Sequence, residues 1–152
     1  MIAFIAAWLI SVITMTLFSI LVNVYTKYEL REHILLKRIA KASALLPSKP
    51  YIGLIIHFCF GLGFMLLFEV LWIVTTLYKS LLWAIAVGGL MGFLGILGWK
   101  LLFKCYPLFS DINFKLYYIQ LFFAHIIFSL TAYGIYQIVE LKNISICVTI
   151  LN

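Results

Sequence analysis

The sequence carries one acidic residue, Glu69, deep inside a long apolar stretch. An ionised carboxylate in a bilayer costs ~3 kcal/mol on insertion scales, so such a group normally faces the protein interior or water. One interpretation is a carboxyl group that couples proton or cation movement, with Phe68 and Trp72 beside it for cation–π contact. The other is a neutral carboxyl group that bonds to a tyrosine or reaches the outer interface. Counting ~1.5 Å per residue along the helices places Tyr133 and Gln137 at its level.

Two histidines, His57 and His125, lie in separate apolar stretches, each in the pattern His-x-x-Phe-[Gly/Ser]-Leu. They stand ~10 Å and ~15 Å from the inner ends of their helices, so both could face one site. The interpretations are structural hydrogen bonding, a bis-His haem or a proton relay. The small residue four positions after each histidine makes room for a ligand or lets another helix pack closely. The predicted polar site within the membrane consists of Glu69, His57, His125, Tyr133 and Ser129.

The sequence gives little indication of a disulfide, a metal site or a catalytic motif. The three cysteines, Cys59, Cys105 and Cys147, are far apart and form no CxxC pair, and two histidines fall short of the three or four protein ligands of a zinc site. We therefore predict no metal site, and we expect Cys59 to be a small core residue. There is no GxSxG or HExxH motif and no Gly-rich phosphate loop.

The composition requires lipid around these residues. Of 152 residues, 66% are hydrophobic and only 11% are charged, whereas a soluble domain has roughly a quarter charged. Runs of ~20 apolar residues cross the ~30 Å hydrocarbon core as helices, because backbone polar groups find no water there. The sequence predicts one all-α domain over residues 1–152, a polytopic integral membrane helical bundle of two tandem helical hairpins. The four predicted spans cover residues 2–24, 51–78, 81–103 and 115–138.

The first loop contains a predicted amphipathic helix over residues 28–46. Leu35, Ile39, Ala42 and Leu46 fall on one helical face, and basic residues lie away from it. We expect this helix to lie on the inner leaflet, with its charges near anionic head groups. The alternative is a docking helix for a cytoplasmic partner.

Basic residues predict the orientation of the chain. Nine lie in or beside the first and third loops and two on the other side, and loops rich in Lys and Arg stay in the cytoplasm. The sequence therefore predicts an inner (plasma) membrane protein with both termini outside the cytoplasm. The net charge of +6 is explained by these anchors, so no nucleic-acid partner is expected.

The two halves of the chain show a pattern of internal repetition. A shift of 81 positions places Ala7, Ser11 and Thr14 on Gly88, Gly92 and Gly95. A shift of 68 positions places His57 on His125. Small residues let helices approach closely in lipid, where apolar side chains gain nothing from contact with each other. The two copies are predicted to be parallel repeats. The predicted packing residues are Ala7, Ser11 and Thr14 in the first copy and Gly88, Gly92 and Gly95 in the second.

The elements follow in a fixed order: a small-residue helix, a basic loop, a helix with His57, a glycine-rich helix and a final helix. The glycine-rich helix contains Gly88, Gly92 and Gly95 and ends near Trp99, and the final helix contains Ala124, His125 and Phe128. In this order of elements the chain resembles small four-helix bacterial inner-membrane proteins of uncharacterised function. The resemblance covers most of the chain and implies a topology, not an activity.

The leading functional prediction is non-enzymatic: an accessory subunit or a transporter-like module of the inner membrane. Four helices are few for a complete transport path, so a homodimer or a larger membrane complex is expected. The alternative is a membrane redox or other enzyme that uses His57 and His125, with haem as the cofactor or with the two imidazoles as a proton relay.

Overall fold

The computed structural model describes residues 2–43, 49–75, 80–107 and 111–150, with side chains described through residue 140. These residues form helices and no strand, which confirms the predicted all-α class. The helices are α1 (Ile2–Thr26), α2 (Glu32–Ser43), α3 (Ile52–Val74), α4 (Leu81–Cys105) and α5 (Phe114–Ile150).

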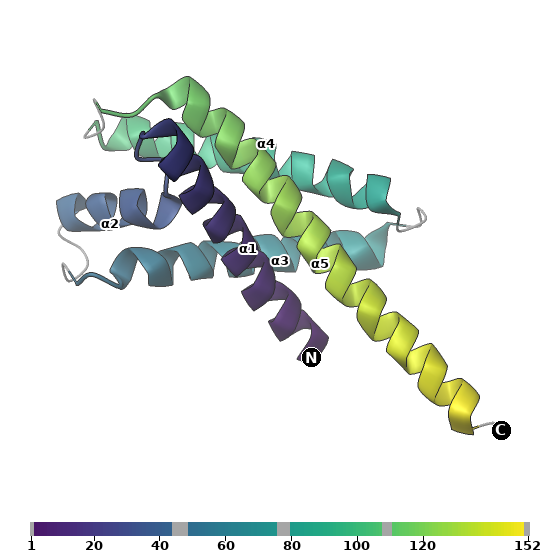
Figure 1. Cartoon of the computed structure of the whole chain (residues 1–152). Coiled ribbons are helices and arrows are strands. Elements are labelled where there is room, and N and C mark those ends of the chain that lie inside the picture. The colour runs from purple at the N-terminus through teal and green to yellow at the C-terminus, as the bar shows by residue number, and fades with distance from the viewer. Residues whose placement is uncertain (1, 44–48, 76–79, 108–110, 151–152) are drawn as a thin grey trace.

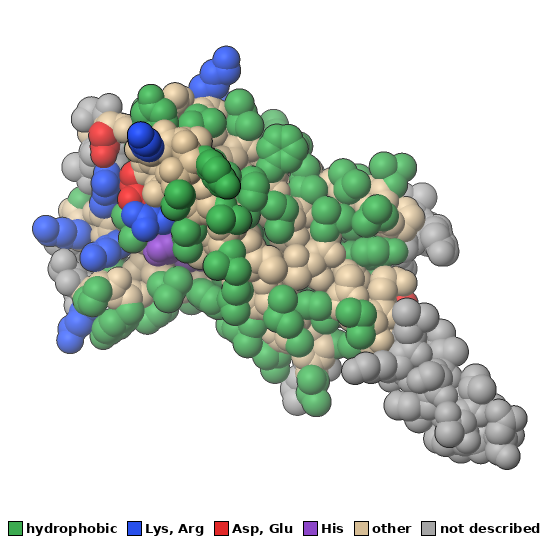
Figure 2. Space-filling model, viewed as in Figure 1, with side chains coloured by type: hydrophobic (Ala, Val, Ile, Leu, Met, Phe, Trp, Pro, Cys, Tyr) green, Lys and Arg blue, Asp and Glu red, His purple; other side chains and the backbone are tan. Residues whose placement is uncertain are grey.

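Four of the helices are long and apolar enough to cross a membrane, namely α1, α3, α4 and the Phe114–Glu140 part of α5. Large apolar side chains remain exposed along all four, and Figure 2 shows them spread over one face of the body of the molecule. In water such a surface would be unfavourable, so it marks the part of the molecule in contact with lipid. The chain is therefore a multi-pass membrane bundle.

Two helix ends differ from the prediction. The second span was predicted to reach residue 78, but α3 ends at Val74 because Thr75 takes an extended backbone conformation. The fourth span was predicted to end at residue 138, but α5 continues to Ile150, and no proline or glycine follows Gly134 to interrupt it.

The helix α5 lies at the centre of the packing, with its most extensive contacts to α4 and α1 (Figure 1). Glycines bring α4 against α5: a Cβ atom at Gly88 would lie 2.6 Å from the Cα of Ile126, and one at Gly92 would lie 3.0 Å from the carbonyl oxygen of Phe122. The helices α3 and α4 touch each other little. A cavity lies between them.

The predicted small residues of α1 also lie between helices. Ala7 and Ser11 are fully buried. The Thr14 hydroxyl lies 3.1 Å from the hydroxyl of Thr131 on α5, within hydrogen-bonding distance. Close packing of α1 on α5 therefore involves the stripe that aligns with the glycines of α4.

The structure corrects the placement of the first-loop helix. The helix α2 covers residues 32–43 and runs antiparallel beside the first half of α3, so it packs lengthwise into the bundle and does not lie flat across its end (Figure 1). Leu35 and Ile39 are buried as predicted, but Ala42 is exposed, and Leu36 and Ala40 are buried in its place. Leu46 lies outside the described residues.

Charge is concentrated at one end of the molecule. Lys and Arg side chains gather at the end that holds α2, whereas the marked N- and C-termini lie toward the other end (Figures 1 and 2). There Arg38 of α2 pairs with Asp111, which precedes α5, at 3.0 Å. Cys59, expected in the core, is exposed on α3 instead.

Candidate functional site

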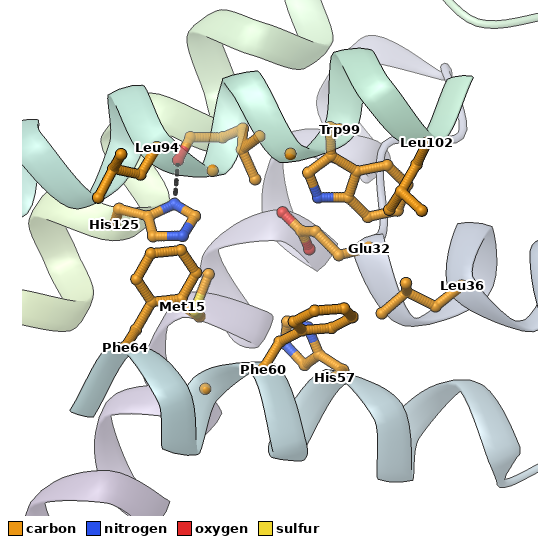
Figure 3. Close-up of a pocket in the computed structure, with 14 residues that line it drawn as sticks. Met15, Glu32, Leu36, His57, Phe60, Phe64, Leu94, Trp99, Leu102 and His125 are labelled. Atoms are coloured by element: carbon orange, nitrogen blue, oxygen red, sulfur yellow. Dashed lines mark hydrogen bonds between the residues drawn. The ribbon is translucent and has the colours of Figure 1, made fainter. Parts of the chain in front are cut away.

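A cavity of about 160 Å³ lies between α3 and α4 in the half of the bundle that holds α2. Most of its wall is apolar and includes the aromatic rings of Phe60, Phe64 and Trp99. Three ionisable side chains also line it. Figure 3 shows them converging from three different helices: Glu32 from α2, His57 from α3 and His125 from α5.

Glu32 is the only acidic residue in the described cavity wall, and only 2% of its surface is exposed. Its Oε1 accepts hydrogen bonds from the Ser19 hydroxyl at 3.0 Å and from the Gln120 amide at 2.9 Å. The same Gln120 amide also donates to the Ser19 oxygen at 2.6 Å. The second carboxyl oxygen, Oε2, is buried and has no hydrogen-bond partner among the described residues.

Burial raises the pKa of Glu32, because removal from water disfavours the charged form. The hydrogen bonds from Gln120 and Ser19 act in the opposite direction and are the smaller effect. Burial therefore shifts the side chain toward the neutral acid, a form that can release a proton when a positive charge arrives beside it.

His57 connects the cavity to the basic end of the bundle. It is buried, and its Nε2 lies 3.0 Å from the Thr16 hydroxyl of α1. Its ring lies 6.3 Å, centre to centre, from that of His33, the half-buried neighbour of Glu32 in α2. Burial lowers the pKa of His33, so near neutral pH its imidazole favours the uncharged form.

The imidazole of His125 is held in one orientation. Its Nδ1 lies 2.8 Å from the Leu121 carbonyl oxygen, which only accepts, so Nδ1–H is the donor. Phe64 packs edge to face against the ring at 4.6 Å. A Cβ atom at Gly95 would lie 2.8 Å from His125 Cε1, so the glycine also provides space for the imidazole.

The structure divides the predicted polar site into separate places. His57 and His125 line the same cavity, but Glu69, Tyr133 and Ser129 do not belong to its wall. Ser129 donates a hydrogen bond to the Ala84 carbonyl oxygen at 2.7 Å and so joins α5 to α4.

Glu69 is half-buried and accepts a hydrogen bond from Tyr136 of α5. This partner differs from Tyr133 and Gln137, the residues that depth counting had placed at its level. Tyr133 instead lies against Trp72 at 6.2 Å. The neighbouring aromatic rings pack on one another, with Trp72 stacked on Tyr136 at 5.2 Å. This arrangement corresponds to the second interpretation of Glu69, a carboxyl group bonded to a tyrosine.

The sequence interpretation missed Glu32 and its two partners, Ser19 and Gln120. The signal was present, because Glu32 precedes Leu35 by three residues and Ile39 by seven, and therefore lies on the apolar stripe of α2. A carboxyl group on the buried face of an amphipathic helix indicates that this face meets a polar partner inside the protein.

The two cavity histidines do not fit a bis-His haem. The Nε2 of His57 already lies within hydrogen-bonding distance of the Thr16 hydroxyl. A cavity of ~150 Å³ holds one benzene ring, so the space here is far smaller than a macrocycle requires. Among the described residues, no group of three or more His, Cys, Asp or Glu side chains is placed to hold a metal ion.

The predicted repeat stays a prediction, although the two halves share a local feature. The residue four positions after each histidine packs against the first long helix of its own half: Gly61 contacts Val12 of α1, and Ser129 bonds to Ala84 of α4.

Comparisons with protein-family models, with curated proteins and with solved structures give no match to this chain.

Proposed function

We propose that this chain is a transporter-like module of the membrane in which the cavity between α3 and α4 binds a small solute while Glu32 exchanges a proton. The observation that carries the proposal is the carboxyl group of Glu32, which lines the cavity, is 2% exposed and has one oxygen without a partner among the described residues. Glu32 thus takes the coupling role that the sequence had suggested for Glu69.

Keeping an acid in this buried place costs free energy. An unpaired buried carboxylate is strongly unfavourable, and a neutral acid still leaves one oxygen unsatisfied at a cost of about 1–3 kcal/mol. An apolar or amide side chain would avoid the ionisation. Ionisable groups held inside membrane proteins commonly mark paths for protons or ions. A functional role for the carboxyl group would explain why a destabilising acid is present at this position.

A route for the proton runs from the cavity toward the basic end. Glu32 and His57 line the same cavity, and the His57 and His33 rings lie 6.3 Å apart. His33 is half-buried and so is more exposed than either of them. An uncharged imidazole has one N–H donor and one acceptor nitrogen, so it can accept a proton on one side and release one on the other between Glu32 and the surface.

We further propose that the basic end faces the cytoplasm of a bacterial cell, which places both termini on the opposite side of the inner membrane. The gathering of Lys and Arg at the α2 end supports this orientation. Fusing a reporter that fluoresces only in the cytoplasm tests it. A reporter inserted between residues 44 and 48 should fluoresce and a reporter fused at the C-terminus should not; the reverse pattern contradicts the orientation.

The test of the coupling is proton movement in vesicles. The purified chain is reconstituted with a pH-sensitive dye inside, and a panel of cationic, neutral and anionic small solutes is added outside. We expect one solute class to change the internal pH with wild type and with Glu69→Gln, but not with Glu32→Gln. The two amide variants are matched in chemistry and differ only in position.

Three results would contradict the proposal: no solute moves protons with wild type, Glu32→Gln behaves like wild type, or only Glu69→Gln abolishes the response. A chain whose wild-type form moves no protons would instead fit an accessory subunit of a larger assembly. Circular dichroism of each variant in detergent shows whether the helices are intact.

A further inference from the structure

We propose that the solute is a small organic cation, an ammonium group on an apolar body, which reaches the cavity from within the membrane and displaces the proton of Glu32. This inference rests on the proposed function and names the chemical class that the same cavity would accept.

The charge of the cavity favours a cation. Glu32 is the only acid in the described wall, and no Lys or Arg belongs to that wall. An anion would therefore meet no positive partner there except a protonated imidazole, and both histidines are buried. An ammonium group would pair with the ionised carboxyl of Glu32 and give its free oxygen, Oε2, a hydrogen-bond donor.

The aromatic rings favour the same class. Phe60 and Phe64 on α3 and Trp99 on α4 line the space into which the Glu32 carboxyl group points (Figure 3). A cation near the face of an aromatic ring is attracted to it, and Trp is the strongest partner. The rings also provide apolar surface for the rest of the solute, which a hydrated inorganic cation would not use.

The mouth of the cavity opens toward lipid. Two of its wall residues are exposed on the apolar outer surface, Phe60 by 51% and Leu94 by 41%. Gly98 is also exposed, and a Cβ atom added there would meet open space. Since α3 and α4 touch each other little, a solute dissolved in the membrane can enter between them. Amines with an apolar body collect in that region of a bilayer, near the anionic head groups.

The size of the cavity limits the body of the solute to about one ring. Its volume of about 160 Å³ is close to the ~150 Å³ of a cavity that binds benzene. Benzylammonium, one aromatic ring with one charged group, is therefore a suitable probe. Benzyl alcohol and benzoate have nearly the same shape with no charge and with a negative charge.

The binding step is a proton exchange without any redox change. The neutral acid of Glu32 loses its O–H proton to water, and the carboxylate that remains pairs with the incoming ammonium group, so one proton leaves for each cation bound. Other ionisable groups around Glu32 also influence the step, and each is left unmutated in every variant of the test. They are His57 on α3, His125 and Tyr117 on α5, and His33 on α2, with the Glu29–Arg31 pair just before it.

The experiment is calorimetric titration of the protein in nanodiscs with benzylammonium, carried out in two buffers of different ionisation enthalpy. We expect about one proton released per cation and an affinity that rises about tenfold per pH unit while Glu32 is mainly protonated. Benzyl alcohol and benzoate should bind at least about tenfold more weakly and release no proton.

Two variants locate the site. Glu32→Gln should lose proton release and bind benzylammonium no better than benzyl alcohol. Gly98→Leu should block the mouth and abolish binding, whereas Gly63→Leu should bind like wild type, because Gly63 also faces open space but lies outside the cavity wall. The glycine pair keeps the test decisive even if the Glu32 variant folds poorly.

The outcomes separate the inference from the function on which it rests. If benzyl alcohol or benzoate binds with a proton exchange that Glu32→Gln removes, the cation class is wrong and proton coupling at Glu32 holds. If no probe exchanges protons with wild type, both are wrong. If benzylammonium binds equally to wild type and to Gly98→Leu, it binds elsewhere and the site is wrong.

Discussion

Replacing Glu32 by Gln should make stability less sensitive to pH, with a sign and a slope that follow from the structure. The amide keeps the shape of the side chain, and its oxygen can still accept from Ser19 and Gln120, as Oε1 of Glu32 does at 3.0 and 2.9 Å. At low pH, where Glu32 is neutral in both the folded and the unfolded chain, the two proteins should differ by about 1 kcal/mol or less.

The difference should change as the pH rises. Burial raises the pKa of Glu32 above its usual 4.5, so between 4.5 and the folded-state pKa the folded chain binds more protons than the unfolded chain. Folding stability then falls with pH by up to about 1.4 kcal/mol per unit. The Gln variant has no such group, so its stability relative to wild type should rise with the same slope. The lowered pKa of His33 acts with the opposite sign below 6.5, but this effect is shared by both proteins.

The assay is unfolding in mixed detergent micelles, followed by tryptophan fluorescence and circular dichroism at several pH values above 4.5. The matched control is Asp111→Asn. The hydrogen bond with Arg38 lowers the pKa of Asp111 below its usual 3.8. The difference in unfolding free energy between Asp111→Asn and wild type should therefore stay constant above about pH 5. The unfolding free energy of Glu32→Gln relative to wild type could instead stay constant with pH, or fall as the pH rises. Either result would refute the claim that Glu32 is buried as a neutral acid.

Two further predictions concern packing and the second polar site. Gly88→Ala should destabilise the bundle by about 1–3 kcal/mol, because its Cβ would lie 2.6 Å from a backbone atom of α5, whereas Gly63→Ala, which faces open space, should be neutral or slightly stabilising; equal effects in the same unfolding assay would contradict the close approach of α4 and α5. Tyr136→Phe should cost about 1 kcal/mol by removing the hydrogen bond to Glu69, and Tyr133→Phe should cost less. A larger loss from Tyr133→Phe would place the partner of Glu69 where depth counting had put it.

The long helices could be predicted from sequence because the property that defines them is local. A run of apolar residues long enough to cross lipid must form a helix whatever surrounds it, so all four spans were found. Their ends were less certain, since α3 stops at Val74 and α5 continues to Ile150. These ends depend on backbone conformation, which hydropathy does not record.

The candidate site could be predicted only in part, because it depends on how the helices rotate and tilt. His57 and His125 have similar calculated depths, and both line the cavity. Counting residues along straight parallel helices failed for the partner of Glu69. The helix α5 crosses α3 at a steep angle in the view of Figure 1, and Tyr136 is the residue that reaches the carboxyl group.

Glu32 was missed for a related reason. Its helix contains many charges and was predicted to lie on the inner leaflet, and Glu32 was not considered as a buried group. In the structure α2 packs along α3, and the close approach at Gly53, whose Cβ position is occupied by the backbone of His33, holds the start of α2 inside the bundle. Which face of a short helix is buried depends on a contact between distant residues, and only the apolar stripe through Leu35 and Ile39 indicated it.

Infrared spectroscopy of the protein in lipid tests most directly whether a neutral carboxylic acid is held in the cavity. The difference spectrum between wild type and Glu32→Gln at neutral pH should contain the C=O stretch of a protonated carboxyl group, and benzylammonium should convert that band into carboxylate bands in wild type only. A difference spectrum with carboxylate bands alone before any solute is added would show that Glu32 is already ionised and would contradict the account.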